Sequence, residues 1–127
     1  MNNLMERQKR VINAIETAIS KIETAIELVV HKEGNVEQPI WQAASEVEYA
    51  LFLMALTQKS ESSAWKTEHK TREIDVGQAL TAAQDSLEEA KKMVNNNSDG
   101  AYQKAWVARR HILAAQDLLR AQKKKEA

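Results

Sequence analysis

Apolar residues recur at helical spacing along most of the chain. In its first segment they alternate steps of three and four from Ile12 onward, which places them on one face of a helix with about 3.6 residues per turn. The stripe consists of Leu4, Ile12, Ile15, Ile19, Ile22, Ile26 and Val29. His31 and Lys32 follow where cations favour the helix dipole, and Gly34 can close the helix. The pattern predicts a helix over residues 3–33.

A second helix is predicted over residues 39–58. Pro39, the only proline, stands where a first helical position is expected, because proline has no N–H to leave unbonded there. The three-four stripe of this helix comprises Ile40, Ala44, Val47, Leu51 and Met54.

A third helix is predicted over residues 70–95. Asp75 with Gln78 resembles a capping box, and a stripe follows it. Its members are Val76, Leu80, Ala83, Leu87, Ala90 and Val94. The polar stretch 59–71, KSESSAWKTEHKT, is either a loop or the weakly amphipathic start of this helix, so its first residue is left open.

Residues 95–100, NNNSDG, form the clearest break in the chain, and Ser98 or Asp99 is expected to cap a fourth helix over residues 100–124. Its stripe contains small residues that allow close helix approach: Ala101, Ala105, Ala108 and Ala115. Four helices with short connections predict an all-α protein, an antiparallel four-helix bundle in up-down-up-down order that forms one domain over residues 1–127.

The second helix carries a second apolar face. With Leu51 at 0° on a helical wheel, a further set falls between about 100° and 200°. This set is the candidate self-association surface: Tyr49, Phe52, Leu53 and Leu56. A helix that is apolar on both faces is buried on both, or it meets a partner. A homodimer is the simplest cover, since two-fold homodimers are the commonest oligomers. The alternative is that residues 59–69 fold back and Trp65 covers the face.

The fourth helix has a second face of different composition. With Ala108 at 0°, Tyr102, Trp106 and Leu113 lie between about 120° and 160°, flanked by arginines. The candidate partner-binding residues are Tyr102, Trp106, Arg109 and Arg110. Tyrosine, tryptophan and arginine are typical of interaction hot spots, and they can also stack on bases and hold phosphates. The alternative is that the rings pack on a neighbouring helix and the arginines are solvated.

Charge changes this picture in one respect. Lys plus Arg equals Asp plus Glu, 18 each, so the zero net charge disfavours a general polyanion binder. Residues 35–58 nevertheless carry three acids and no base, a charge of −3, whereas residues 97–127 carry seven bases and three acids, a charge of +4. This asymmetry favours pairing of the second helix with the fourth, within one chain or between two.

Candidate catalytic chemistry is nearly absent from the sequence. The chain has no cysteine and no glycine-rich phosphate loop, and it lacks the Glu-x-x-His pairs with which helical bundles hold metals. Glu27 and His31 stand four residues apart, but an ion pair at the surface explains them better than a metal ion. His111 lacks the lysine and glycine that follow a phosphorelay histidine. We expect no metal, no cofactor and no enzymatic activity.

These observations predict a non-catalytic protein–protein interaction module, such as an adaptor, a regulatory subunit or an assembly component, that acts as a homodimer and also binds another protein. The first ten residues are polar, and the longest apolar run is 49–56, whereas a membrane span needs about 20 residues. A cytoplasmic location away from membranes is therefore expected. The alternative is a small nucleic-acid-binding or ribonucleoprotein-associated subunit that uses the face of the fourth helix. A phosphorelay or metal-binding bundle has less support.

Overall fold

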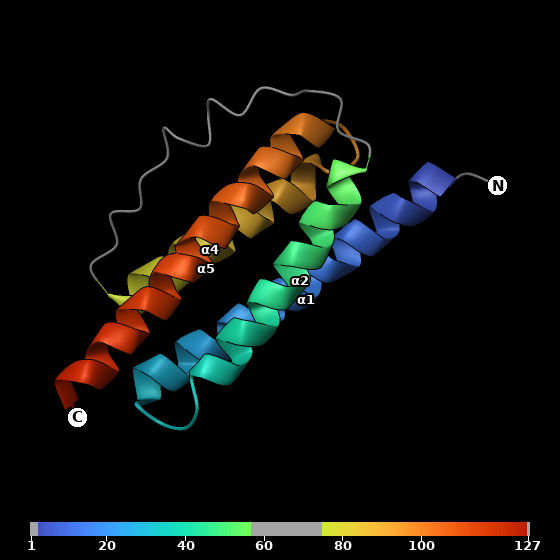
Figure 1. Ribbon diagram of the computed structural model, residues 1–127. Helices are drawn as coiled ribbons and strands as arrows, with labels where there is room; N and C mark the ends of the chain where they lie inside the picture. The colour runs from blue at the N-terminus through green and yellow to red at the C-terminus, as the bar shows by residue number, and fades with distance from the viewer. Residues whose placement is uncertain (1–2, 57–74, 127) are drawn as a thin grey trace.

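The computed structural model describes residues 3–56 and 75–126, all-α over these ranges (Figure 1). Its helices are α1 (Asn3–His31), α2 (Glu37–Ala55), α4 (Val76–Met93) and α5 (Ser98–Glu126). All four predicted helices are confirmed, with ends that shift by a few residues. The predicted last residues 57–58 of the second helix, the predicted first turns at residues 70–74 of the third, and the stretch 59–71 with Trp65 lie outside the described residues.

The helix ends follow local hydrogen bonding. The Asp75 carboxylate accepts from the Gln78 backbone N–H at 2.8 Å, which confirms the predicted cap of α4. For α5 the predicted cap, Ser98 or Asp99, is wrong: the helix begins at Ser98, and the side chain of the preceding Asn97 accepts from the Gly100 N–H at 3.0 Å. In α2, Pro39 is the third helical residue rather than the first, because the helix begins at Glu37. It still lies in the first turn, where N–H groups lack an intrahelical partner.

Each helix packs against two others. α1 contacts α2 and α4, and α5 contacts α2 and α4, whereas the diagonal pairs α1–α5 and α2–α4 do not meet. Antiparallel neighbours surround one hydrophobic core (Figure 1). Seven large side chains in it have less than 2% of their surface exposed: Ile15, Ile22, Ile40, Val47, Leu80, Leu87 and Ile112. The apolar stripes read from the sequence therefore supply the core of a helical bundle.

The order of helix directions differs from the prediction. The end of α1 lies beside the start of α4, where Gly34 and Val76 line one hollow. Since α2 follows α1 after a short loop, α2 and α4 both start at this end and run the same way (Figure 1). The up-down-up-down order is thus wrong: directions alternate between neighbours in space but not along the sequence. Stripe positions define which face of a helix is buried and not which way the helix runs. Bundles that contain two successive parallel helices need one long connection.

The described helices include none that is both long and apolar enough to cross a membrane.

Candidate interaction surface

One side of α2 faces away from both neighbouring helices and carries large apolar side chains. Trp41 is 65% exposed, Phe52 61%, Leu56 55% and Tyr49 44%. We call this side the α2 outer face, and its exposed residues are Trp41, Ser45, Glu48, Tyr49, Phe52 and Leu56. Three of the four predicted self-association residues therefore lie together at the surface.

Leu53 is the exception, and its assignment to the outer face is wrong. Only 7% of its surface is exposed, and it belongs to the core. On the wheel Leu53 is about 100° from Phe52. Because α2 packs against α1 on one side and α5 on the other, its buried arc is wide enough to include Leu53.

Trp41 is the outer-face residue that the sequence reading missed. It lies about 20° from Phe52 on the same wheel, so the signal was present in the sequence. The predicted set was drawn only from the apolar run at 49–56, and Trp41 stands about two turns before that run.

The α2 outer face is poor in charge. Glu48 is its one charged residue, and the Glu48 carboxylate accepts from Nε of Arg109 on α5. Nearer the start of α2, Glu37 pairs in the same way with Lys123. The two pairs confirm that the acidic second helix lies against the basic fourth one within a single chain. The negative charge of the outer face is therefore neutralised by Arg109 of the same chain.

The predicted partner-binding residues on α5 have a different environment. Tyr102 and Trp106 are partly buried and pack against the core, and the guanidinium carbon of Arg110 lies 5.2 Å from the centre of a Trp106 ring. Arg109 is paired with Glu48. Much of this set therefore takes part in packing within the chain, while Leu113 on the same face is 39% exposed.

The structure brings the two predicted surfaces side by side. Arg109 meets Glu48 across two antiparallel helices. Phe52 lies one turn beyond Glu48, and Trp106 lies nearly one turn before Arg109, so these two rings fall at the same level of the α2–α5 seam. The outer surface of the seam is thus a single region, with exposed apolar residues on α2 and half-buried aromatic residues on α5.

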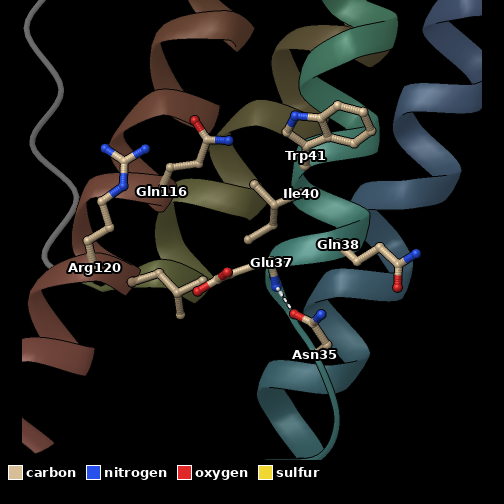
Figure 2. A pocket seen from close by; sticks show the side chains of 8 residues that line it. Asn35, Glu37, Gln38, Ile40, Trp41, Gln116 and Arg120 are labelled. Atoms are coloured by element: carbon tan, nitrogen blue, oxygen red, sulfur yellow. Dashed lines mark hydrogen bonds between the residues drawn. The ribbon is translucent and has the colours of Figure 1, made fainter. Parts of the chain in front are cut away.

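A groove of about 410 Å³ opens at one end of this seam (Figure 2). Its lining residues are Asn35, Glu37, Gln38, Ile40, Trp41, Gln116, Leu119 and Arg120. Figure 2 shows Glu37 and Ile40 directed from α2 toward α5, with Gln116 and Arg120 on the opposite side and Trp41 at the edge. Among the described residues that line the groove, Glu37 is the one carboxylate.

The described part of the chain contains no candidate metal-binding cluster. Its His, Asp and Glu side chains nowhere form a group of three or more that could hold a metal ion. His111, the phosphorelay candidate, is half-buried rather than exposed.

Comparisons of the chain with protein-family models, with curated proteins and with solved structures find no significant match.

Proposed function

We propose that the protein is a non-catalytic helical interaction module that acts as a homodimer, and that its α2 outer face binds a second copy of the chain. The observation that carries this proposal is the contrast between helices. From Trp41 to Leu56 the exposed residues of α2 include large apolar side chains and one charge, which is already paired. The exposed residues of α4 are mainly polar or charged.

The size of the α2 outer face supports a stable contact. Taking about 150–250 Å² for a whole large side chain, the exposed fractions of Trp41, Tyr49, Phe52 and Leu56 leave roughly 450 Å² of side-chain surface in water. A standard interface buries about 800 Å² per partner, and its centre is depleted in charge and rich in aromatic residues. Four side chains therefore supply more than half of that area. Trp106 and Leu113 on α5 extend the same surface as its rim.

A second copy is the occupant that we favour because a two-fold interface uses the same patch on both subunits. Any charge on such a patch therefore faces the same charge on the second copy and must be neutralised. The pairing of Glu48 with Arg109 meets this requirement, since it removes the repulsion between two facing carboxylates. A cytoplasmic location belongs to the same proposal, as does a role as adaptor, regulatory subunit or assembly component.

The nucleic-acid alternative has less support. It requires the arginines of α5 to hold phosphates, but the Arg109 guanidinium is engaged by Glu48 and that of Arg110 lies over Trp106. A separate α5 surface for another protein is weakened in the same way.

The mass in solution, measured by light scattering on a sizing column, tests the proposal. We expect the wild-type chain at about 28.6 kDa, twice its 14.3 kDa. Phe52→Glu should give a folded monomer, because it places a charge in the apolar centre of the contact. Val30→Glu is the matched control: Val30 is 68% exposed on α1, away from the α2–α5 seam, so that variant should remain a dimer.

A wild-type chain that elutes as a monomer at high micromolar concentration contradicts the homodimer. In that case a different protein or the chain's own residues 59–69 cover the face. A dimer that persists in Phe52→Glu contradicts the assignment of the α2 outer face.

A further inference from the structure

The residues of the α2 outer face have the spacing of a helix-packing seam. Ser45, Tyr49, Phe52 and Leu56 follow one another at steps of four, three and four, the repeat that brings two helices together in coiled coils. The occupant that fits this seam is another helix. If the chain pairs with itself, as proposed above, that helix is α2 of the second copy.

We propose that the two α2 helices pair in antiparallel orientation about a two-fold axis that passes level with Glu48 and Tyr49. This inference rests on the proposed homodimer and adds its geometry. In this register Ser45 lies opposite Phe52 of the second copy, and Trp41 lies opposite Leu56 of the second copy. The two-fold symmetry generates each of these two pairs twice, once on either side of the axis.

Side-chain size favours this orientation over the parallel one. The antiparallel register sets a small residue, Ser45, against a large one, Phe52, so ring and hollow interdigitate at both ends of the seam. A parallel pairing sets Ser45 against its own copy and Trp41 against its own copy, which leaves a gap at one level and crowds another. Close packing without voids is what a stable contact requires.

Burial of Ser45 leaves no unsatisfied donor. Its hydroxyl donates to the backbone carbonyl of Trp41 at 3.1 Å, within the same helix. A buried hydroxyl that lacks a partner is destabilising, so this internal bond makes Ser45 compatible with an aromatic ring above it.

The charges near the axis are also compatible with the pairing. Glu48 of each copy arrives with its own Arg109, so two negative and two positive groups meet there and their sum is zero. Each guanidinium retains further N–H donors besides the Nε that bonds Glu48, and these can reach the carboxylate of the second copy.

Disulfide cross-linking tests the register directly, because the chain contains no native cysteine. In the antiparallel pairing two copies of residue 49 are nearly level. Two copies of residue 45 are separated along the axis by seven residues, or about 10 Å. A disulfide needs Cβ atoms about 3.5–4.5 Å apart. We therefore expect Tyr49→Cys to form a covalent dimer on mild oxidation, and Ser45→Cys alone to form none.

Mixing Ser45→Cys with Phe52→Cys should give a mixed disulfide, which intact mass identifies when one chain is isotopically labelled. If loss of the Phe52 ring weakens association, Trp41→Cys mixed with Leu56→Cys tests the same register. The mass of each reduced variant, measured first, shows whether it is dimeric.

Each outcome has a separate meaning. A monomeric wild-type chain contradicts the homodimer itself. A dimer in which Tyr49→Cys does not cross-link overturns the α2–α2 contact while the homodimer stands. Efficient self-linking of Ser45→Cys shows parallel pairing and overturns the register alone.

Discussion

Arg109 on α5 donates from its Nε to the carboxylate of Glu48 on α2, across the seam between the most basic and the most acidic of the described helices. The pair joins two residues that are 61 positions apart in the sequence. It also occupies the one charge on the α2 outer face. In the proposed homodimer, a contact within the chain thereby prepares the surface that meets the second copy.

Reversing one charge of this pair should affect association more than folding. Glu48→Lys places two cations together, yet both side chains are more than a third exposed, so we expect the free energy of unfolding of the monomer to fall by at most about 1 kcal/mol. Dimer affinity should fall further, because like charges then meet near the axis. Denaturant titration and sedimentation equilibrium measure the two effects.

Two further variants serve as controls for this change. Glu16→Lys makes the same charge change at an exposed position of α1 and should alter neither quantity. The double variant Glu48→Arg with Arg109→Glu restores opposite charges and should recover most of the affinity. If the double variant associates no better than Glu48→Lys, the pair has no part in preparing the surface.

The buried alanines of α5 allow the neighbouring helices to pack closely against it. Ala108 is fully buried, and α5 packs closely on both α4 and α2. Ala108→Leu adds atoms where no space exists, so we expect the free energy of unfolding to fall by about 1–3 kcal/mol. Ala121→Leu, exposed on the same helix, should leave it unchanged within about 0.5 kcal/mol. Equal stabilities of these two variants would show that α5 does not need its small residues.

The core could be predicted from the sequence because burial follows helical periodicity. Ile15, Ile22 and Leu87 all lie on stripes read at 100° per residue, and all are buried. The same method misplaced Leu53, because a stripe gives the centre of the buried arc and the packing of two neighbours gives its width.

Other features depend on tertiary information that no single stripe contains. Helix direction is one: α2 and α4 run the same way, and that follows from how the bundle closes. The engagement of Arg109 by Glu48 is another. The charge imbalance predicted that these two helices attract, but it left open whether the partners belong to one chain. Trp41 was missed for a simpler reason: the predicted set was drawn from the apolar run at 49–56, and Trp41 lies before that run.

Acidic conditions should remove one contact between α4 and α5. The Lys104 ammonium lies 2.8 Å from the Glu89 carboxylate and lowers the pKa of Glu89 below 4.5, first through their hydrogen bond and then by Coulomb attraction. A group whose pKa is lower in the folded state stabilises the fold above its unfolded pKa, and this stabilisation is lost as pH falls through the folded pKa. Glu89 is exposed, so the effect is small.

Thermal unfolding of Lys104→Gln, followed by circular dichroism, checks this prediction. Its Tm should lie below that of the wild-type chain at pH 7, and the difference should shrink as the pH falls toward 3. Lys124→Gln, which removes an exposed charge from the same helix, is the control. A Tm difference for Lys104→Gln that persists unchanged at pH 3 would show that Lys104 acts through something other than the ionised Glu89.

Trp106 and Arg110 allow packing within the chain to be separated from contact with a partner. Trp106 is partly buried against the core, so Trp106→Ala should lower the free energy of unfolding by about 2 kcal/mol, less than the 3–5 kcal/mol of a fully buried tryptophan. Leu113→Ala, at a more exposed position of the same face, should lower it by much less.

The charge over the ring adds a smaller contribution. Arg110→Gln should lower the free energy of unfolding by about 0.5–1 kcal/mol, because its guanidinium lies over the Trp106 ring. A double-mutant cycle of Trp106→Leu and Arg110→Gln isolates the coupling between the two side chains. A coupling near zero, together with full stability of Trp106→Ala, would mean that the pair contributes nothing to the folded chain and would return both residues to the role of a separate partner surface. A measurable coupling instead explains the aromatic and basic face of α5 by packing within the chain, because the two side chains then stabilise each other.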